Sequence, residues 1–318
     1  MIAFRNFRTS DAEGVVTLTN ECSAADRLDE PTSLAEFQEA MMAPNADFER
    51  DLLVAESQGH LVGFVNLWIE PTRRGILRLR VHPGFRNRGI GTALMEWALG
   101  HAGEMDLALI DAPIKAKLTG QQAFFGRFGF APERCWWVMR LDLSGELPVP
   151  LIPAGFDIRN FQDEGDVETL TAITNVAFAE HWGEREYAVD EERYWTSRPW
   201  FDPGLVWFVH EARSGQVAGY AWARIRQERI ELTGDRAGHI GELGVHPNFR
   251  RRGLGRALLL CAVGALKERG LAAAELEVDG GNTNALRLYE SLGFFQKDEF
   301  RWYRKKMAGH DQAGGSER

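Results

Sequence analysis

The feature that most constrains this 318-residue chain is an internal repeat. The segment VHPGFRNRGIGTAL, which begins at Val81, recurs as VHPNFRRRGLGRAL from Val245, 164 residues later. At the same spacing, AFFGRFGF from Ala123 matches RLYESLGF from Arg287, so the register holds without a gap for more than forty residues. Because each copy carries its own apolar patterns, the chain should fold as two similar units.

A proline-rich segment separates the two copies. Residues 144–153 read SGELPVPLIP, with three prolines and no helical period, which is typical of a linker. We therefore expect one domain over residues 1–147 and a second over residues 148–318, with a flexible tail after residue 307. The separation between matching segments grows from 154 to 164 residues along the chain, so the second copy carries about ten extra residues, which we place within residues 224–238.

Apolar residues follow the same order of patterns in both copies. Alternating runs on both sides of Ser214-Gly215 predict a hairpin of two strands in the second copy. Helical spacing over residues 253–269 predicts a helix that Gly270 ends, with a strand before it and a buried strand and a short helix after it. The predicted fold class is α/β, with two tandem domains that are each a mixed, partly antiparallel sheet flanked by helices.

The composition narrows the possible functions. Apolar residues make up 44% of the chain and charged residues 26%, as in soluble globular proteins. No apolar run approaches the roughly 20 residues of a membrane span, and the first residues lack the apolar core of a signal peptide, so we expect a cytoplasmic protein without membrane contact. The net charge of −9 argues against a nucleic-acid partner and is compatible with a cationic substrate.

The cysteines suggest neither cross-links nor a metal. Cys22, Cys135 and Cys261 are far apart and form no C-x-x-C pair. The sequence therefore predicts no disulfide framework and no metal site.

A loop rich in arginine and glycine occupies residues 250–255 of the second copy, between a strand that ends at Val245 and a helix that begins near Gly253. A helix start presents unpaired N–H groups and about half a positive charge, and glycine lets a phosphate approach the main chain. Flanking arginines add charge-assisted hydrogen bonds. The loop therefore predicts a site for a small anion such as a pyrophosphate. It matches neither a P-loop nor a Rossmann turn, and the remaining alternative is a solvated basic turn.

A second motif, NTNALRLYESLGF, occupies residues 282–294. Together, the R-x-x-G-x-G loop and this N-x-x-A-x-x-L-Y-x-x-x-G-F motif resemble the acetyl-coenzyme A (acetyl-CoA) site of the GCN5-related N-acetyltransferases, the GNAT family. The resemblance covers both halves except the linker and the residues after Met307. It implies two GNAT-like domains and an enzyme that transfers an acetyl group from acetyl-CoA to the primary amine of a small molecule, without a metal.

The resemblance also implies roles for particular residues. The loop would hold the pyrophosphate, Val245 would pair its main chain with the pantetheine arm, and Asn284 would help to seat the cofactor. Tyr289 would be the general acid that protonates the departing thiolate. The implied cofactor-binding set is Val245, Arg250, Arg251, Arg252, Gly253, Leu254, Gly255, Arg256 and Asn284.

A catalytic base is also expected, because a lysine-like amine is uncharged only about one time in a thousand or fewer at pH 7. Glu242 lies three residues before Val245 on the same predicted strand, where its carboxylate can face the acetyl group directly or through water. We therefore predict that Glu242 is the base. The alternative for Glu242 is a strand-edge carboxylate paired with an arginine, and His246 is a weaker candidate for the base.

Residues after the first predicted helix of the second copy are candidates for the acceptor pocket. His181, Trp182 and Glu184 either line that pocket or belong to a surface loop. Trp195 and Trp200 either form the floor of a substrate cleft or belong to the core.

The two copies differ at the positions that carry the chemistry. Subtracting 164 places Phe125 at the position of Tyr289, Arg78 at Glu242, Gly120 at Asn284 and Leu118 at Asn282. The first domain is therefore predicted to be catalytically silent. Its retained loop is either a second cofactor site or a helix start kept for packing. The possible second cofactor site is Val81, Arg86, Asn87, Arg88, Gly89, Ile90, Gly91 and Thr92.

Two other functions stay open at this point. One is a non-catalytic sensor that binds acyl-CoA and reports it to a partner; such a protein needs neither Glu242 nor Tyr289. The other is a peptide or protein N-terminal acetyltransferase, which differs in its acceptor alone. The motifs determine neither the acceptor nor the oligomeric state.

Overall fold

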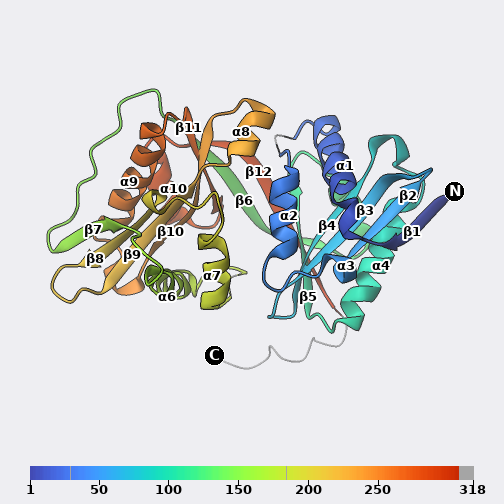
Figure 1. The fold of residues 1–318 in the computed structure, drawn as a ribbon, viewed down its shortest axis with the longest axis horizontal. Coiled ribbons are helices and arrows are strands. Elements are labelled where there is room, and N and C mark those ends of the chain that lie inside the picture. The colour runs from blue at the N-terminus through green and yellow to red at the C-terminus, as the bar shows by residue number, and fades with distance from the viewer. Residues whose placement is uncertain (29, 184, 308–318) are drawn as a thin grey trace. The chain divides into compact units, whose positions relative to one another are not determined.

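A computed structural model describes residues 1–28, 30–183 and 185–307, which form two compact units (Figure 1). Unit 1 contains Met1–Trp136 and the segment that begins at Glu299, and unit 2 contains Trp137–Asp298. The tail expected after residue 307 and the pocket candidate Glu184 lie outside the described residues.

Unit 1 is a mixed sheet with helices. Its elements are β1 (Ile2–Asn6), α1 (Ala12–Ala25), α2 (Leu34–Met42), α3 (Phe48–Asp51), β2 (Leu52–Ser57), β3 (His60–Ile69), β4 (Arg74–Val81), α4 (Ile90–Glu104), β5 (Leu109–Lys115), α5 (Thr119–Arg127) and most of β12 (Phe295–Lys306). The strand order is β1-β2-β3-β4-β5-β12. The β4–β5 pair is parallel and the other neighbours are antiparallel.

Unit 2 repeats this plan. Its elements are the second half of β6 (Ala131–Asp142), β7 (Phe156–Asn160), α6 (Asp166–Phe178), α7 (Val189–Thr196), β8 (Val206–Glu211), β9 (Val217–Arg224), α8 (Gln227–Thr233), β10 (Ala237–Val245), α9 (Leu254–Glu268), β11 (Ala273–Asp279) and α10 (Thr283–Glu290). The strand order is β6-β11-β10-β9-β8-β7, and β10–β11 is parallel. The α/β fold class with mixed sheets is confirmed, and α8 lies in the stretch where the extra residues were expected.

Helices cover both faces of the unit 2 sheet, and the alternation along β9 shows why. Ala221 and Ala223 pack into one buried cluster with the apolar residues of α9. Tyr220 and Trp222 point the other way and pack into a second cluster with α6. Since successive strand residues face opposite sides of a sheet, both faces of β9 are apolar and both are covered.

The two halves of the chain exchange their closing strands. Leu143, just after β6, donates a main-chain hydrogen bond to Ala272 of unit 2 at 2.9 Å. Met307, just after β12, donates the matching bond to Ala108 of unit 1, also at 2.9 Å. The donors and the acceptors each stand 164 residues apart (307 − 143 and 272 − 108), the repeat spacing, so each unit is closed by the final strand of the other half of the chain.

Ion pairs hold these exchanged strands in the same way. Arg304 on β12 binds the fully buried Asp111 on β5 through two hydrogen bonds of 2.7 Å. Arg140 on β6 binds the buried Glu275 on β11. The units therefore do not coincide with a division of the chain at residue 147, because part of β6 precedes that residue yet belongs to unit 2.

Candidate active site

The two parallel strands of unit 2 separate part-way along their length. The ladder joins Ala237–Ile240 of β10 to Ala273–Leu276 of β11 and then stops, although β10 continues to Val245 and β11 to Asp279. Beyond Ile240, the edge of β10 that faces β11 has main-chain groups that this ladder does not use. A ligand with amide groups fits such a slot, because it can pair with an exposed strand edge.

A turn with several main-chain N–H groups lies at the end of this slot. After β10 the chain forms a short 3-10 helix at Pro247–Phe249 and enters α9 through Gly253, which caps the helix with φ of 86°. Arg251 also has a positive φ, of 62°. Left-handed residues just before a helix turn successive N–H groups toward one side, and the first turn of α9 adds further unpaired N–H groups. Unpaired N–H groups at the start of a helix are the kind of main-chain arrangement that can bind an anion.

The arginines of the loop have different environments. Arg250 donates hydrogen bonds to the carbonyls of Val245 at 3.2 Å and Ala177 at 3.0 Å, and it pairs with Glu180. Its side chain therefore holds the loop against β10 and the end of α6. Arg252 lies over the ring of Phe249.

The other predicted loop residues lie around the start of α9. Arg251 is exposed, and Arg256 donates to the Ser291 hydroxyl at 2.9 Å. Leu254 is buried, so only its main chain faces the junction. A Cβ added at Gly255 would lie 3.7 Å from both Val245 and Leu288, which shows that β10, α9 and α10 meet here.

Tyr289 lies on α10, next in sequence to Leu288. Its side chain is 7% exposed and its ring packs against Phe294. Burial raises the pKa of Tyr289 to about 12, so the phenol is protonated at neutral pH. Within the described residues its hydroxyl makes no hydrogen bond, which leaves the proton available to a ligand. Asn284 is exposed on α10, whereas Asn282 caps that helix by accepting from the Ala285 N–H.

A β-bulge positions Glu242. The register between β9 and β10 shifts between Ile240 and Glu242, which leaves Gly241 without a partner residue. Bulges redirect side chains, and glycine suits this one because it carries none. Glu242 accepts a hydrogen bond from the Tyr220 hydroxyl, which itself accepts one from Thr174 at 2.8 Å.

The environment of Glu242 changes the pKa of its carboxyl group. Burial raises the pKa of Glu242, and the hydrogen bond from Tyr220 partly opposes that rise. In the part of the chain that the structure describes, Glu242 forms no ion pair, so the alternative of an arginine-paired carboxylate is wrong. His246 accepts from the Asn248 N–H and caps the 3-10 helix, which gives it a structural role.

Glu192 and Tyr220 were not predicted from the sequence. Glu192 on α7 is 4% exposed, and its pKa is raised to about 8, first by burial and then by the negative charge of Glu242. Tyr220 had a signal, because the first copy carries Phe64 at the matching position. Glu192 had none, since residues 190–192 are all acidic and the pattern does not show which one is buried.

Comparison with known proteins identifies the family. The model described as "Acetyltransferase (GNAT) family" matches residues 15–130 and 168–294, one segment in each half. The chain belongs to the GNAT family of acetyltransferases. A mycothiol acetyltransferase of Thermobispora bispora is 35% identical to this GNAT protein over 289 residues, which span 89% of this chain and 92% of that one.

Solved GNAT structures share the tandem fold. A GCN5-related N-acetyltransferase from Sphaerobacter thermophilus superposes with a TM-score of 0.78 at 26% identity, covering 96% of each chain. A tandem GNAT protein from the clavulanic acid biosynthesis pathway gives a TM-score of 0.74 at 20% identity, covering 96% of this chain and 99% of that one. The second likeness concerns the fold alone.

The first GNAT unit keeps the shape of the slot. Its β4–β5 ladder joins Arg74–Ile76 to Leu109–Asp111 and then stops, and Gly89 caps α4 with φ of 81°. Arg86 bonds to the Val81 carbonyl at 3.1 Å, as Arg250 does to Val245, and it pairs with Asp26.

The remaining residues of the possible second cofactor site lie in the same turn. Asn87 has a φ of 61°, like its counterpart Arg251, and Arg88 lies over the ring of Phe85. Ile90 is buried at the start of α4, while Gly91 and Thr92 are on its first turn. The main chain of both junctions therefore has the same form.

The chemical groups of the second unit are missing from the first. The β3–β4 ladder runs through Arg78 and Leu77 without a bulge, and Leu77 is a buried core residue. Phe125 and Phe64 stand where the second unit has Tyr289 and Tyr220. The first unit thus has the main chain of the site without its carboxylate and phenols.

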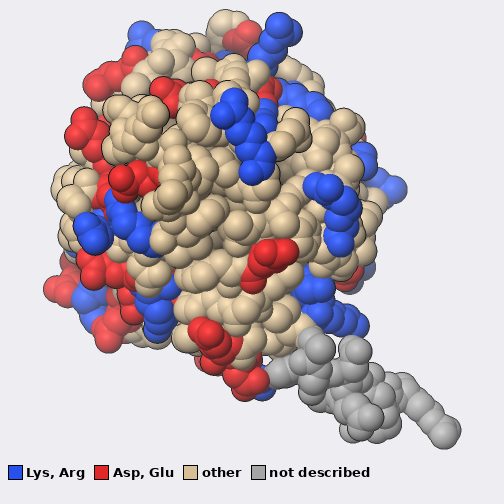
Figure 2. Space-filling model, turned by 90° about the vertical axis from the view of Figure 1, so that its right-hand side faces the viewer, with Lys and Arg blue, Asp and Glu red and all other residues tan. Residues whose placement is uncertain are grey.

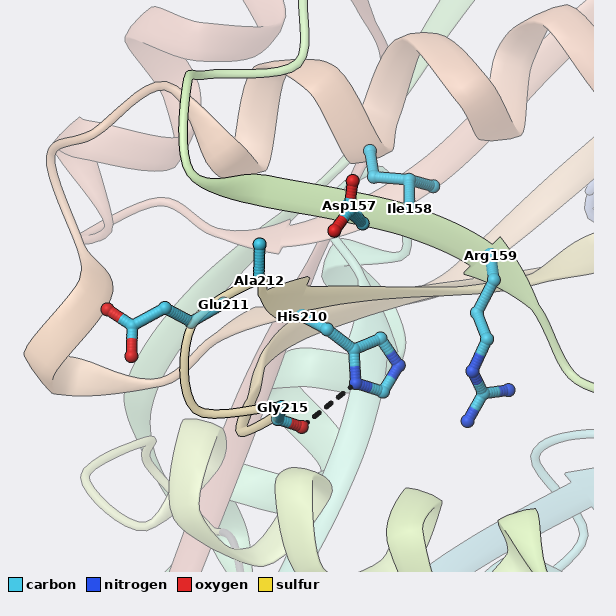
Figure 3. A pocket seen from close by; sticks show the side chains of 7 residues that line it. All are labelled: Asp157, Ile158, Arg159, His210, Glu211, Ala212 and Gly215. Carbon is cyan, nitrogen blue, oxygen red and sulfur yellow. Dashed lines mark hydrogen bonds between the residues drawn. The ribbon is translucent and has the colours of Figure 1, made fainter.

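Two surface features of this GNAT protein lie apart from the slot. A shallow hollow at the β7–β8 edge is lined by Asp157, Ile158, Arg159, His210, Glu211, Ala212 and Gly215 (Figure 3). It contains none of the predicted site residues, and β9 and β10 separate it from β11. On the face drawn in Figure 2, acidic and basic side chains are interspersed and form no broad basic field.

Neither a membrane helix nor a metal cluster was found among residues 1–28, 30–183 and 185–307. No helix there is both long and apolar enough to span a bilayer. No group of three or more His, Cys, Asp or Glu side chains in these ranges is arranged to hold a metal ion.

Proposed function

We propose that this GNAT enzyme transfers an acetyl group from acetyl-CoA to the primary amine of a small molecule, and that unit 2 alone carries out the reaction. The observation that carries the proposal is the contrast between two otherwise similar slots. One has Glu242 on a bulge and the phenol of Tyr289, and the other has Arg78 and Phe125.

The donor fits the slot through main-chain contacts. The pantetheine arm would pair with the edge of β10 near Val245, and the pyrophosphate would bind the N–H groups of the junction from Arg251 to Arg256. Arg251 and Arg252 are exposed beside that junction and supply positive charge. Arg250 contributes by holding the loop in place, because its side chain is bound to Val245 and Ala177.

In the proposed reaction the amine nitrogen bonds to the thioester carbon, and the carbon–sulfur bond then breaks. Glu242 takes a proton from the amine, and its raised pKa makes it a stronger base than an exposed glutamate. An N–H group near Val245 stabilises the oxyanion. Tyr289 gives its proton to the departing thiolate and regains one from solvent.

The acceptor is proposed to be a small molecule because curated relatives, among them the Thermobispora bispora protein, are mycothiol acetyltransferases. The acceptor of those enzymes is therefore the first amine to test. A broad panel of primary amines should accompany it, because the acid–base groups described here specify an amine without selecting its skeleton.

The test is a thiol-release assay with acetyl-CoA and this amine panel. Tyr289→Phe should lower kcat by about 10² to 10⁴ with little change in the affinity for acetyl-CoA, as expected when a general acid is removed. Tyr303→Phe is the matched control, because it removes the hydroxyl of a buried tyrosine in unit 1. Unchanged turnover in Tyr289→Phe would remove this residue from the mechanism. A wild-type protein that binds acetyl-CoA but acetylates no amine would instead favour a sensor.

A further inference from the structure

Glu192 on α7 is a buried carboxyl group. It is 4% exposed, and within the described residues its side chain forms neither a hydrogen bond nor an ion pair. The neighbouring acids on α7 are both paired, Asp190 with Arg193 at 2.5 Å and Glu191 with Arg185 at 2.6 Å. The local arginines are therefore engaged by other carboxylates. A carboxyl group is costly to bury unless something compensates its charge.

Glu192 and Glu242 come from different elements but lie close enough for their charges to interact. The negative charge of Glu242 acts on Glu192, and the charges of both carboxylates act on the Tyr220 hydroxyl. The other charged groups that act on Glu192 are Glu191 and Arg185, which are bound to each other. Neither Glu192 nor Glu242 has a cation of its own in the part of the chain that the structure describes.

Aromatic side chains lie next to these two carboxyl groups. Trp222 is the register partner of Glu242 on β9. The ring of Trp222 stacks with that of Trp200, with 6.5 Å between their centroids. The centroids of Trp200 and Trp195 are 6.4 Å apart, and Trp195 follows Glu192 by three residues on α7. The guanidinium of Arg224 lies over the Trp200 ring, 5.4 Å from its centroid. The rings can therefore offer a ligand apolar contact beside the two carboxyl groups.

We propose that Glu192 and Glu242 together bind the acceptor as a protonated amine, with Trp222 and Trp200 beside its carbon skeleton. This inference rests on the proposed function and adds its substrate class, a cationic amine with an apolar or aromatic group close to the nitrogen. Glu192 is the specificity residue that holds the charge. Glu242 accepts the proton once the donor is in place.

The arrangement has a thermodynamic consequence. Two nearby carboxyl groups, Glu192 buried and Glu242 half-buried, resist being ionised together, so without a cation one of them retains a proton at neutral pH. A bound ammonium group favours ionisation of both. Binding of a cationic amine near pH 7 should therefore release a proton from the protein, and binding of a neutral isostere should not.

The experiment is a calorimetric titration near pH 7 with benzylammonium and with benzyl alcohol, its neutral counterpart. We expect wild type to bind benzylammonium at least tenfold more tightly than Glu192→Gln does, with proton release seen as a dependence of the heat on the buffer. Benzyl alcohol should not distinguish the two proteins. Asp190→Asn is the matched control, because it removes an equal charge from an 88% exposed side chain on the same helical turn.

The outcomes separate this inference from the proposed function. Equal binding of benzylammonium by wild type and Glu192→Gln, or no binding by wild type, overturns the cation subsite. If wild type releases thiol with amines but binds benzylammonium no more tightly than Glu192→Gln does, the acetyltransferase reaction is supported and the subsite is rejected. A Glu192-dependent preference without turnover of any amine would support the subsite and reject the reaction. Circular dichroism of each variant confirms that it is folded.

Discussion

The buried acid Glu192 links the chemistry of the site to the stability of the protein. Its pKa is raised from an ordinary 4.5 to about 8, so between these values the native state holds a proton that the unfolded chain releases. A group of this kind weakens the folded state as pH rises through that window. Ionisation of Glu192 therefore lowers the stability of the folded protein most at the upper end of this pH range.

The first prediction concerns this pH dependence. Glu192→Gln should become more stable relative to wild type as pH rises from about 5 to about 8, because glutamine never ionises, with a gain on the order of a few kcal/mol at the upper end. Urea denaturation at pH 5, 6.5 and 8 measures it. Asp190→Asn should follow wild type throughout. A stability difference that stays constant across this range would show that Glu192 titrates as an ordinary glutamate.

At the level of single elements, the strand-to-helix junctions are the most predictable parts of the molecule. The start of a helix at the glycine of each loop was predicted from the sequence. The structure adds that Gly253 and Gly89 are both left-handed, with nearly equal φ angles of 86° and 81°. They provide a matched pair, because the backbone strain of a larger residue should be similar at both.

We predict that Gly253→Val abolishes the binding of acetyl-CoA by unit 2, because the added side chain disturbs the N–H groups of the junction. Gly89→Val should leave turnover nearly intact while costing a similar amount of stability, about 1 kcal/mol or more. Steady-state kinetics and thermal unfolding of both variants measure the two effects. Comparable losses of activity without unfolding would mean that unit 1 takes part in catalysis.

Some residues of the site are determined by tertiary packing and cannot be predicted from a local sequence pattern. Tyr289 was predicted from the resemblance of residues 282–294 to the GNAT motif, and the repeat places Phe125 at the matching position. Glu192 was not, since three adjacent acids lie on an eight-residue helix and tertiary contacts decide which is buried. The bulge at Gly241 is partly predictable. An isolated glycine in a strand indicates a bulge, but it does not give the direction in which the side chain of Glu242 points.

For the whole molecule, the exchange of β6 and β12 follows from the symmetry of the repeat. Arg140 and Arg304 occupy matching positions, and so do Asp111 and Glu275, so the same kind of ion pair forms in either connection. A linear division at the proline-rich linker is what the sequence suggests. No local feature of the sequence distinguishes the linear arrangement from the exchanged one, because the same kinds of contact form in both.

This exchange leads to a prediction about fragments. Segments 1–147 and 148–318, expressed together, should associate and copurify, because each supplies the strand that closes the sheet of the other. Affinity purification through a tag on one fragment, followed by size-exclusion chromatography, measures this. Two fragments that each fold as stable monomers and ignore each other would contradict the exchange.

The exchange of β12 also determines the order in which the units can complete their folding during translation. β5 ends at Lys115, but its neighbour β12 begins at Phe295. At about 5–20 residues per second, roughly 10–40 s of translation separate the two. Unit 2 already has β6 when its own strands emerge. Unit 2, although most of it is synthesised last, can therefore complete its sheet before unit 1. The sheet of unit 1 keeps an unpaired edge at β5 until β12 has been synthesised.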